Sequence, residues 1–333
     1  MRDVKWGVLS TAEIGMKKVI PGIQGSNGNT VYAIASRNAK RAADAAAQAG
    51  IPVSYGSYEE LLNDPDIEVV YIPLPNHMHV QWSIKAMEAG KHVLCEKPLA
   101  LKTEDIDKLA GVSKKTGKFL AEGFMVRYHP QWKTAKKVIQ NGTVGEVRAI
   151  QGVFSYFNAD EGNIRNIPEY GGGGIWDIGC YPVMTSRYIF GEEPFRVCAL
   201  LERDPKLRID RLGSVIMEFP SGQASFLCST QLVPCQRMTI LGTKGRLELE
   251  IPFNAPPDRK SQIYLSRGEV YQENFQLLDF DVCDQYGLQA ESFARTIRGE
   301  DVQVVSLEDS RKNLKVLEAI FHSAETGKWE NVD

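Results

Sequence analysis

The sequence predicts an α/β protein of two domains: a doubly wound parallel sheet, then an α+β domain with a large open, mostly antiparallel sheet. The chain has 333 residues, more than one hydrophobic core usually organises. Its first third alternates short apolar segments with helical segments of about ten residues, the pattern of βαβ units. The remainder consists mainly of longer strand-like segments separated at hairpin spacing. We place the domains at residues 1–122 and 123–333.

The first domain is predicted from short strands rich in β-branched residues and from helices such as the alanine-rich segment that Gly50 ends. The predicted strands are Val4–Leu9, Thr30–Ser36, Val53–Tyr55, Ile67–Pro73, His92–Cys95 and Lys118–Ala121. The predicted helices are Glu13–Gln24, Ala39–Ala49, Tyr58–Asn63, Val80–Ala89 and Thr103–Lys115. Strands in such an alternation pair in parallel through right-handed crossovers.

The second domain is predicted to carry a sheet with one solvated face, because apolar and polar residues alternate in segments such as 246–251. Its predicted strands are Val147–Phe157, Phe195–Leu201, Gly213–Phe219, Ala224–Thr230, Gln236–Leu241 and Arg246–Ile251. Its predicted helices are Gln131–Asn141, Gln289–Arg298 and Leu307–Thr326. An exposed sheet face usually finds a partner, so we expect a homodimer or homotetramer formed through it.

Composition excludes several classes of protein. The formal net charge is −3, from 39 Lys and Arg against 42 Asp and Glu, which gives no basic face for nucleic acid or an anionic membrane. No stretch approaches the roughly 20 apolar residues that cross a bilayer, and the N-terminus lacks an apolar signal core. The six cysteines are scattered without a C-x-x-C pair, as in reduced thiols of a cytoplasmic protein.

The loop after the first strand resembles a degenerate dinucleotide-binding turn. Aligned to G-x-G-x-x-G it reads Ser10-x-Ala12-x-x-Gly15, so only the third glycine is kept. Small residues still permit close approach of a pyrophosphate, to which the following helix presents backbone amides. The predicted contacts come from Ser10, Thr11, Ala12 and Ile14. An ordinary βα turn explains this segment equally well.

The end of the second strand favours NADP over NAD. NAD-specific folds place an acidic residue about 20 residues after the glycine turn to bind the ribose 2′-hydroxyl. This chain offers Ser36 and Arg37 instead, with Arg41 one helical turn later. A hydroxyl and guanidinium groups would bind a 2′-phosphate, which a carboxylate would repel. The alternative is that both arginines are simply the solvated start of a helix.

Two further segments follow strand ends, where ligands bind in open α/β sheets. The residues that we predict there for the cofactor are Leu74, Pro75, Asn76, His79, Glu96 and Lys97. Lys97 precedes a proline, which disfavours helical conformation at the lysine. The lysine is then a cation at the mouth of the cofactor crevice. A lone surface lysine at a strand end is the alternative reading.

The chain resembles the Gfo/Idh/MocA oxidoreductases along nearly its whole length. The resemblance rests on three segments, 89–100 (AGKHVLCEKPLA), 125–131 (MVRYHPQ) and 171–182 (GGGGIWDIGCYP). The last segment and the Ser-x-Ala turn are similar to the branch with NADP-dependent D-xylose dehydrogenases, dimeric dihydrodiol dehydrogenases and glucose–fructose oxidoreductase. The resemblance to this family implies a Rossmann domain followed by an open-sheet domain.

Carried over residue by residue, the resemblance makes Lys97 the catalytic lysine, Tyr181 the acid/base and Asp177 the acidic residue before it. Asp177 and Tyr181 are at i and i+4, so a helix would present both to one side. Oxidation of a sugar hydroxyl removes a hydride and a proton. A phenol is a poor base at neutral pH unless a cation such as the Lys97 ammonium stabilises the phenolate. Asp177 orients either a sugar hydroxyl or the lysine, and a packed structural tyrosine is the alternative for Tyr181.

The second domain and the domain junction supply the predicted substrate wall, in which arginines and aromatic rings suit a polyol. Its residues are Arg127, Tyr128, Tyr156, Phe157 and Arg165, together with Asp177 and Tyr181. Tyr156 and Phe157 could equally be ordinary sheet residues. His77, His79 and His129 have no accompanying acidic cluster, so we predict no metal.

The sequence therefore predicts an NADP-dependent dehydrogenase acting on a sugar, of the aldose 1-dehydrogenase kind. A sugar ketoreductase or trans-dihydrodiol dehydrogenase is the nearest alternative. A transhydrogenase with permanently bound cofactor is disfavoured because the export and arm segment of glucose–fructose oxidoreductase is missing. A non-catalytic NADP-sensing regulator is the alternative from another class, and a retained lysine–tyrosine pair argues against it.

Overall fold

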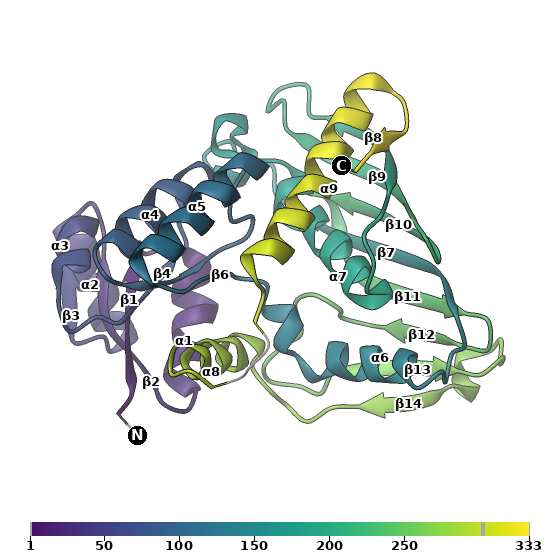
Figure 1. Ribbon diagram of the computed structural model, residues 1–333, viewed down its shortest axis with the longest axis horizontal. Coiled ribbons are helices and arrows are strands. Elements are labelled where there is room, and N and C mark those ends of the chain that lie inside the picture. Colours follow the sequence, from purple (N-terminus) through teal and green to yellow (C-terminus); the bar gives the residue numbers. More distant parts are fainter. Residues whose placement is uncertain (1, 301–303, 333) are drawn as a thin grey trace. The chain divides into compact units, whose positions relative to one another are not determined.

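The computed structural model describes residues 2–300 and 304–332, and its internal contacts divide the chain into two compact units. The first unit contains residues 1–128 and 284–311, and the second contains 129–283 and 312–333. The chain therefore passes from one unit to the other after Tyr128, after Cys283 and after Arg311. Figure 1 labels the elements of both units.

The first unit contains a six-stranded parallel sheet in the order β3-β2-β1-β4-β5-β6. Its strands are β1 (Val4–Leu9), β2 (Asn29–Ala35), β3 (Val53–Tyr55), β4 (Val69–Ile72), β5 (His92–Cys95) and β6 (Leu120–Glu122). From β1 the sheet is extended in one direction by β2 and β3 and in the other by β4, β5 and β6. In a doubly wound fold, the loops at the carboxyl ends of the two strands at this switch point form the ligand crevice. The predicted parallel sheet is confirmed.

Helices cover both faces of this sheet (Figure 1). They are α1 (Ile20–Gly25), α2 (Ala39–Ala49), α3 (Tyr58–Asn63), α4 (His79–Glu88), α5 (Thr103–Thr116) and α8 (Gln285–Ile297). The side chains of α1, α2 and α8 share one apolar core with Trp6 and Val8 of β1. Between those two, Gly7 points to the other face, where an added Cβ would lie 2.7 Å from Leu61 of α3.

Helix α8 completes the first core although it comes from far along the sequence. The ring of Phe293 lies 5.4 Å from that of Trp6 and 5.2 Å from that of Phe119, centroid to centroid. Both Trp6 and Phe293 are fully buried. Aromatic rings of this size bury much apolar surface, so α8 is part of the unit's hydrophobic core.

The second unit contains a nine-stranded sheet in the order β14-β13-β12-β11-β7-β10-β9-β8-β15. Its strands are β7 (Val147–Phe157), β8 (Arg196–Arg203), β9 (Asp210–Phe219), β10 (Gly222–Ser229), β11 (Gln231–Gly242), β12 (Arg246–Leu249), β13 (Gln262–Ser266), β14 (Gln276–Asp279) and β15 (Glu330–Asn331). Within the described residues β7 and β10 pair in parallel, and the other recorded neighbours pair antiparallel. The predicted open, mostly antiparallel sheet is confirmed.

One face of the second sheet is covered by helices α6 (Pro130–Gln140), α7 (Cys180–Phe190) and α9 (Leu307–Thr326) (Figure 1). A hydrogen bond joins helix α9 to strand β8, because the Ser323 hydroxyl accepts from the amide of Ala199 at 3.0 Å. The opposite face keeps apolar side chains exposed, with Leu200 76% and Ile216 43% accessible.

The predicted element ends differ from the observed ones where turn chemistry interrupts the pattern. Strand β11 begins at Gln231, five residues before the predicted start, because a register shift between Gln231 and Cys235 accommodates Pro234 within the strand. Helix α8 begins four residues early, where the Asp284 side chain accepts a hydrogen bond from the Tyr286 amide. Strands β13, β14 and β15 were not predicted.

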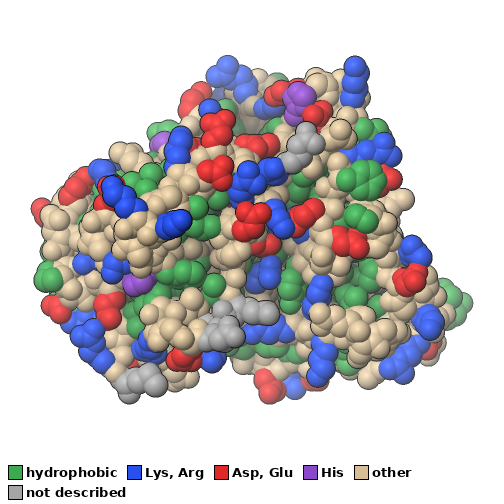
Figure 2. Space-filling model, in the orientation of Figure 1, with side chains coloured by type: hydrophobic (Ala, Val, Ile, Leu, Met, Phe, Trp, Pro, Cys, Tyr) green, Lys and Arg blue, Asp and Glu red, His purple; other side chains and the backbone are tan. Residues whose placement is uncertain are grey.

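Charged side chains of both signs are interspersed on the face that Figure 2 shows, as expected from the near-neutral net charge. Across the described residues, no helix combines the length and apolar character required to cross a membrane.

Candidate active site

The turn after β1 places Ser10 in a backbone conformation that favours glycine, with φ of 97°. Its hydroxyl accepts a hydrogen bond from the Ala12 amide at 3.2 Å and donates one to the Pro73 carbonyl at 3.3 Å. The serine thus takes the backbone role of the first glycine of a G-x-G-x-x-G turn and links the loops after β1 and β4. Strained residues of this kind cost about 1–3 kcal/mol and concentrate at functional sites.

Gly15 is the glycine that the turn keeps, and contacts within the chain do not require it. An added Cβ would meet Pro73 at 3.6 Å and Tyr71 at 3.7 Å, which are ordinary contact distances. The residue also begins a π-helical turn, Gly15–Val19, in which the Ile20 amide bonds to the Gly15 carbonyl. Such turns are rare and often lie at functional sites.

At the end of β2 two guanidinium groups lie near one phenol. Ser36 is buried, whereas Arg37, just before α2, and Arg41, in its first turn, are exposed. Burial raises the pKa of the Tyr58 hydroxyl, while the positive charges of Arg37 and Arg41 act on it in the opposite direction. Two cations and a neutral hydroxyl are donors of the kind that a phosphate monoester binds.

The loops after β4 and β5 are held together by a buried histidine. The His79 ring lies 2.7 Å from the Leu74 carbonyl through Nε2 and 2.8 Å from the Pro98 carbonyl through Nδ1. Burial lowers the pKa of His79 to about 4, against the opposing effect of the two carbonyls. His79 is fully buried, so any part that it takes in cofactor binding is indirect.

Glu96 and Lys97 follow β5 at the carboxyl edge of the sheet, next to the crevice at β1 and β4. The Glu96 carboxylate accepts a hydrogen bond from the Tyr71 hydroxyl at 2.7 Å. Burial, with the Glu96 charge, holds the pKa of Tyr71 well above its usual range, so this phenol stays a donor. Both predicted residues are partly accessible.

The second unit brings Tyr156, Arg165 and Asp177 together. The Tyr156 hydroxyl donates to Oδ2 of Asp177 at 2.5 Å, and Nε of Arg165 donates to Oδ1 at 3.1 Å. Burial and the Asp177 charge raise the pKa of Tyr156, which keeps the phenol protonated. The Asp177 carboxylate therefore accepts from both donors, and its ion-pair partner Arg165 has a side chain that is 40% exposed.

Tyr181 lies at the start of α7 in an aromatic cluster. Its ring centroid is 5.8 Å from Phe154 and 5.6 Å from Phe253, and those two rings stack at 4.9 Å. Asp177 lies in a π-helical turn, Ile175–Gly179, just before α7, so the stretch to Tyr181 is not a regular α-helix. This cluster fixes the Tyr181 ring, which is 5% exposed.

The glycine run before Asp177 is required by the chain's own packing. A Cβ on Gly172 would lie 2.5 Å from the Arg165 carbonyl, and one on Gly173 would lie 2.0 Å from Oδ1 of Asp210. The Asp210 carboxylate accepts the Ile175 amide at 2.6 Å, and it is almost fully buried. Burial raises the pKa of Asp210 to about 6.

The other predicted substrate residues do not belong to the cluster of Tyr156, Arg165 and Asp177. Arg127 belongs to the first unit and pairs with Asp309 at 3.4 Å. Tyr128 is buried in the same unit. Phe157 is 67% exposed at the end of β7, next to Tyr156 but on the alternate side of the strand. In the part of the chain that the structure describes, no group of three His, Cys, Asp or Glu could hold a metal ion.

Sequence reasoning missed the residues that support the second-unit cluster. Phe253 follows β12 in an irregular segment, and no periodic pattern marks it. Phe154 is a buried strand residue like many others. Asp210 is an acidic residue at the start of an apolar strand, which is common at a protein surface. Only its burial makes it unusual, and the sequence does not show that burial.

Comparison with known proteins agrees with this arrangement. The family profile described as "Oxidoreductase family, NAD-binding Rossmann fold" matches residues 4–124, and the "GFO/IDH/MocA C-terminal domain" profile matches residues 132–248. A Rhizobium meliloti protein named as an uncharacterized oxidoreductase is 46% identical over 99% of both chains. A Haloferax volcanii D-xylose 1-dehydrogenase (NADP(+)) is 36% identical over 98% of this chain and 99% of its own.

Solved structures show the same fold. A 3-ketoreductase from Actinomadura kijaniata in complex with NADP and TDP-benzene has a TM-score of 0.90 at 26% identity, over 97% of this chain and 98% of its own. An aldose–aldose oxidoreductase from Caulobacter crescentus has a TM-score of 0.88 at 25% identity, over 99% of this chain and 100% of its own. Both the fold and the arrangement of domains in the sequence are thus shared with oxidoreductases.

Proposed function

Because the chain belongs to the Gfo/Idh/MocA oxidoreductase family, we propose that it is an NADP-dependent oxidoreductase that transfers hydride between the nicotinamide and a hydroxyl or carbonyl carbon of a sugar. Within this proposal, an aldose 1-dehydrogenase of the D-xylose kind is the first candidate. The D-xylose 1-dehydrogenase relative and the NADP-bound ketoreductase support it.

The observation that carries the proposal is the placement of Lys97 at the carboxyl edge of a Rossmann sheet, in a chain that also holds Tyr181. Structures of the Actinomadura ketoreductase include one variant with a lysine replaced and one with a tyrosine replaced. These two positions are as far apart along that chain as Lys97 and Tyr181 are along this one. The match supports treating the two residues as one functional pair.

NADP suits the first unit on chemical grounds. Ser10, in its glycine-like conformation, and the helix that follows would cradle the pyrophosphate, and Arg37 and Arg41 would bind the 2′-phosphate. Leu74, Pro75 and Asn76 would lie against the nicotinamide half, beside Glu96 and Lys97. When bound, the cofactor supplies a hydride acceptor or donor, which no side chain of a protein provides.

Proton transfer falls to the protein. In oxidation Tyr181 would take the proton of the sugar hydroxyl, and in reduction it would return it, with the Lys97 ammonium stabilising the phenolate and bonding the substrate oxygen. Asp177 is bonded through both oxygens, so we assign it the orientation of Tyr156 and Arg165 rather than proton transfer. Arg165 would donate its other N–H groups to sugar hydroxyls, and the Tyr156 oxygen would accept hydrogen bonds from them.

A sugar ketoreductase is the second candidate, supported by relatives such as the Streptomyces antibioticus dTDP-3,4-didehydro-2,6-dideoxy-alpha-D-glucose 3-reductase, 30% identical over 89% of both chains. The test is an absorbance assay of nicotinamide reduction with NADP and with NAD across aldoses, followed by the reverse assay with keto sugars. Turnover of an aldose with NADP is expected. Cofactor binding without turnover of any substrate would contradict the proposal and indicate a sensor.

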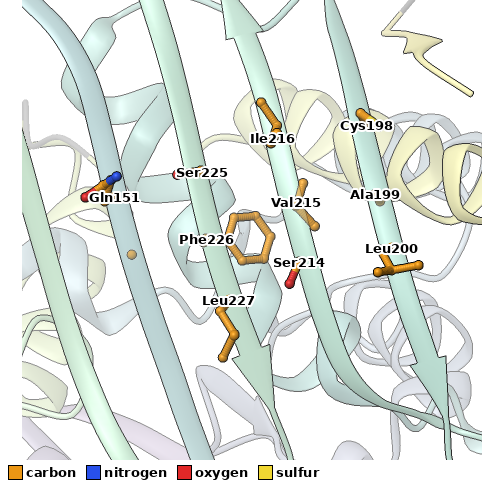
Figure 3. Close-up of a pocket in the computed structure, with 11 residues that line it drawn as sticks. Gln151, Cys198, Ala199, Leu200, Ser214, Val215, Ile216, Ser225, Phe226 and Leu227 are labelled. Carbon is orange, nitrogen blue, oxygen red and sulfur yellow. The ribbon is translucent and has the colours of Figure 1, made fainter.

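We also propose that a second copy of the chain covers the open face of the second sheet. A hollow of about 520 Å³ lies on this sheet, lined from β7, β8, β9 and β10 (Figure 3). Leu200, Ile216 and Leu227 contribute apolar side chains to it. A sheet face can pair with its own copy about a two-fold axis, and an apolar face of this kind is rarely left to solvent.

A further inference from the structure

His79 is the first residue of α4 and lies between two loops that follow adjacent strands. One loop runs from the end of β4 through Leu74 to Asn76, and the other runs from the end of β5 through Lys97 and Pro98. The imidazole is completely buried. Its two ring nitrogens face the carbonyls of Leu74 and Pro98 at 2.7 and 2.8 Å.

Carbonyl oxygens accept hydrogen bonds and never donate them, so every hydrogen bond at these two contacts needs an N–H on the histidine. Pro98 has no backbone N–H of its own and follows Lys97 directly. The carbonyl that His79 reaches is thus one residue beyond the lysine. A hydrogen bond at this point restrains the lysine's backbone, and losing a buried donor leaves the carbonyl desolvated and unbonded.

We propose that His79 is a positioning residue whose buried ring holds the Lys97–Pro98 segment against the Leu74–Asn76 segment and donates its one ring N–H to a carbonyl of these segments. The inference rests on the proposed function, since His79 acts through Lys97 and through the cofactor-contacting loop. The ring itself touches neither substrate nor cofactor. It sets where the ammonium stands relative to the bound dinucleotide.

The consequence is kinetic. A catalytic group displaced by about 1 Å can lose about 100-fold in rate, even when the substitution lies outside the site. His79→Leu keeps a buried side chain but removes the ring N–H. We expect kcat to fall by about 10- to 100-fold. His79→Gln, which retains an amide donor, should recover part of this loss.

His92→Gln is the matched control. His92 begins β5, at the strand end opposite Lys97, and its Nδ1 accepts the Phe119 amide at 3.0 Å. This variant perturbs the same strand without touching the Lys97 loop, so its kcat should stay within about twofold of wild type. Thermal unfolding identifies folded variants. Equal kcat in wild type and folded His79→Leu overturns the proposal, and if that variant does not fold, unchanged kcat in His79→Gln does so.

Two readouts remain if the proposed sugar chemistry fails. Nitrogen-15 NMR of the five histidines should show a His79 ring N–H that exchanges slowly with solvent and disappears in His79→Gln. NADP affinity, followed by fluorescence, should weaken in His79→Leu but not in His92→Gln. A missing protected ring proton overturns the inference whatever the enzyme's substrate, whereas lack of sugar turnover in the wild type overturns only the proposed function.

Discussion

The Tyr156 hydroxyl donates a hydrogen bond to Asp177, which lies 21 residues later in the turn before α7. The same carboxylate accepts Nε of Arg165 on its other oxygen. A strand, a short loop and a helix start therefore meet at one carboxylate. This cluster needs no residue of the first unit, so it is preformed within the second.

Tyr156→Phe tests this cluster. The substitution keeps the ring and removes the donor, and a hydrogen bond to a charged group contributes about 1.5–3 kcal/mol. We expect kcat/KM for the sugar to fall by about 10- to 100-fold. Tyr264→Phe is the control, because Tyr264 donates to Gln262 on strand β13. Equal losses in both variants would mean that the effect is general destabilisation.

Lys97→Met and Tyr181→Phe test the proton-transfer pair. General acid–base catalysis contributes about 10²–10⁴-fold, so each variant should lose that much of kcat with its fold intact. The double variant should be little worse than either single one, since residues that act as a unit are not additive. Near-normal turnover in either single variant would refute the assignment.

Arg37→Ala tests the cofactor preference. Removing a guanidinium that binds the 2′-phosphate should lower kcat/KM with NADP by about 10-fold or more while leaving NAD nearly unchanged. Lys40→Ala is the matched control, since Lys40 is an exposed cation three residues after Arg37, in α2. An unchanged ratio of NADP to NAD efficiency in Arg37→Ala would remove the arginine from the cofactor site.

Asp210→Asn tests a pH effect on stability. Burial raises the pKa of Asp210 in the folded protein to about 6, from 3.8, so the folded state binds this proton more tightly than the unfolded chain does. The resulting stabilisation, about 3 kcal/mol, is complete below pH about 4 and is lost as the pH rises through about 6. Urea unfolding between these pH values should show this loss in wild type but not in Asp210→Asn. Parallel curves for both proteins would contradict it.

Leu200→Lys tests the second copy on the open sheet. Burying the charged lysine side chain in an interface costs free energy, because the ammonium group loses its hydration. The substitution at this exposed position should therefore reduce the molar mass measured by light scattering to that of one chain. Val270→Lys changes an equally exposed apolar residue that does not line the hollow, and it should leave the mass unchanged. A single chain in the wild type would end this proposal.

Much of the fold followed from local patterns. The helix Ala39–Ala49 and the strand Val147–Phe157 were predicted with their observed ends, because propensity and alternation decide such segments. Strand β11 was predicted only from Gln236, since the register shift that accommodates Pro234 within the strand depends on its neighbour β7. The parallel pairing of β7 and β10 is likewise a tertiary property.

The site divides in the same way. The family resemblance singled out Asp177, and a place near the glycine run or the domain junction singled out Tyr156 and Arg165. The structure brings these three residues into contact. The hydrogen bond from the Ile175 amide to Asp210 and the aromatic contacts of Tyr181 were not foreseen, because both depend on residues distant in sequence. The convergence of Lys97 with Tyr181 stays a prediction.

Helix α8 has a consequence for synthesis. Because Phe293 packs on Trp6, the nascent Rossmann sheet emerges from the ribosome with an uncovered apolar face and keeps it until α8 has been synthesised. A gene fragment that ends after Tyr128 should therefore yield a protein that aggregates. To express the first unit alone, residues 284–311 must be fused to this fragment.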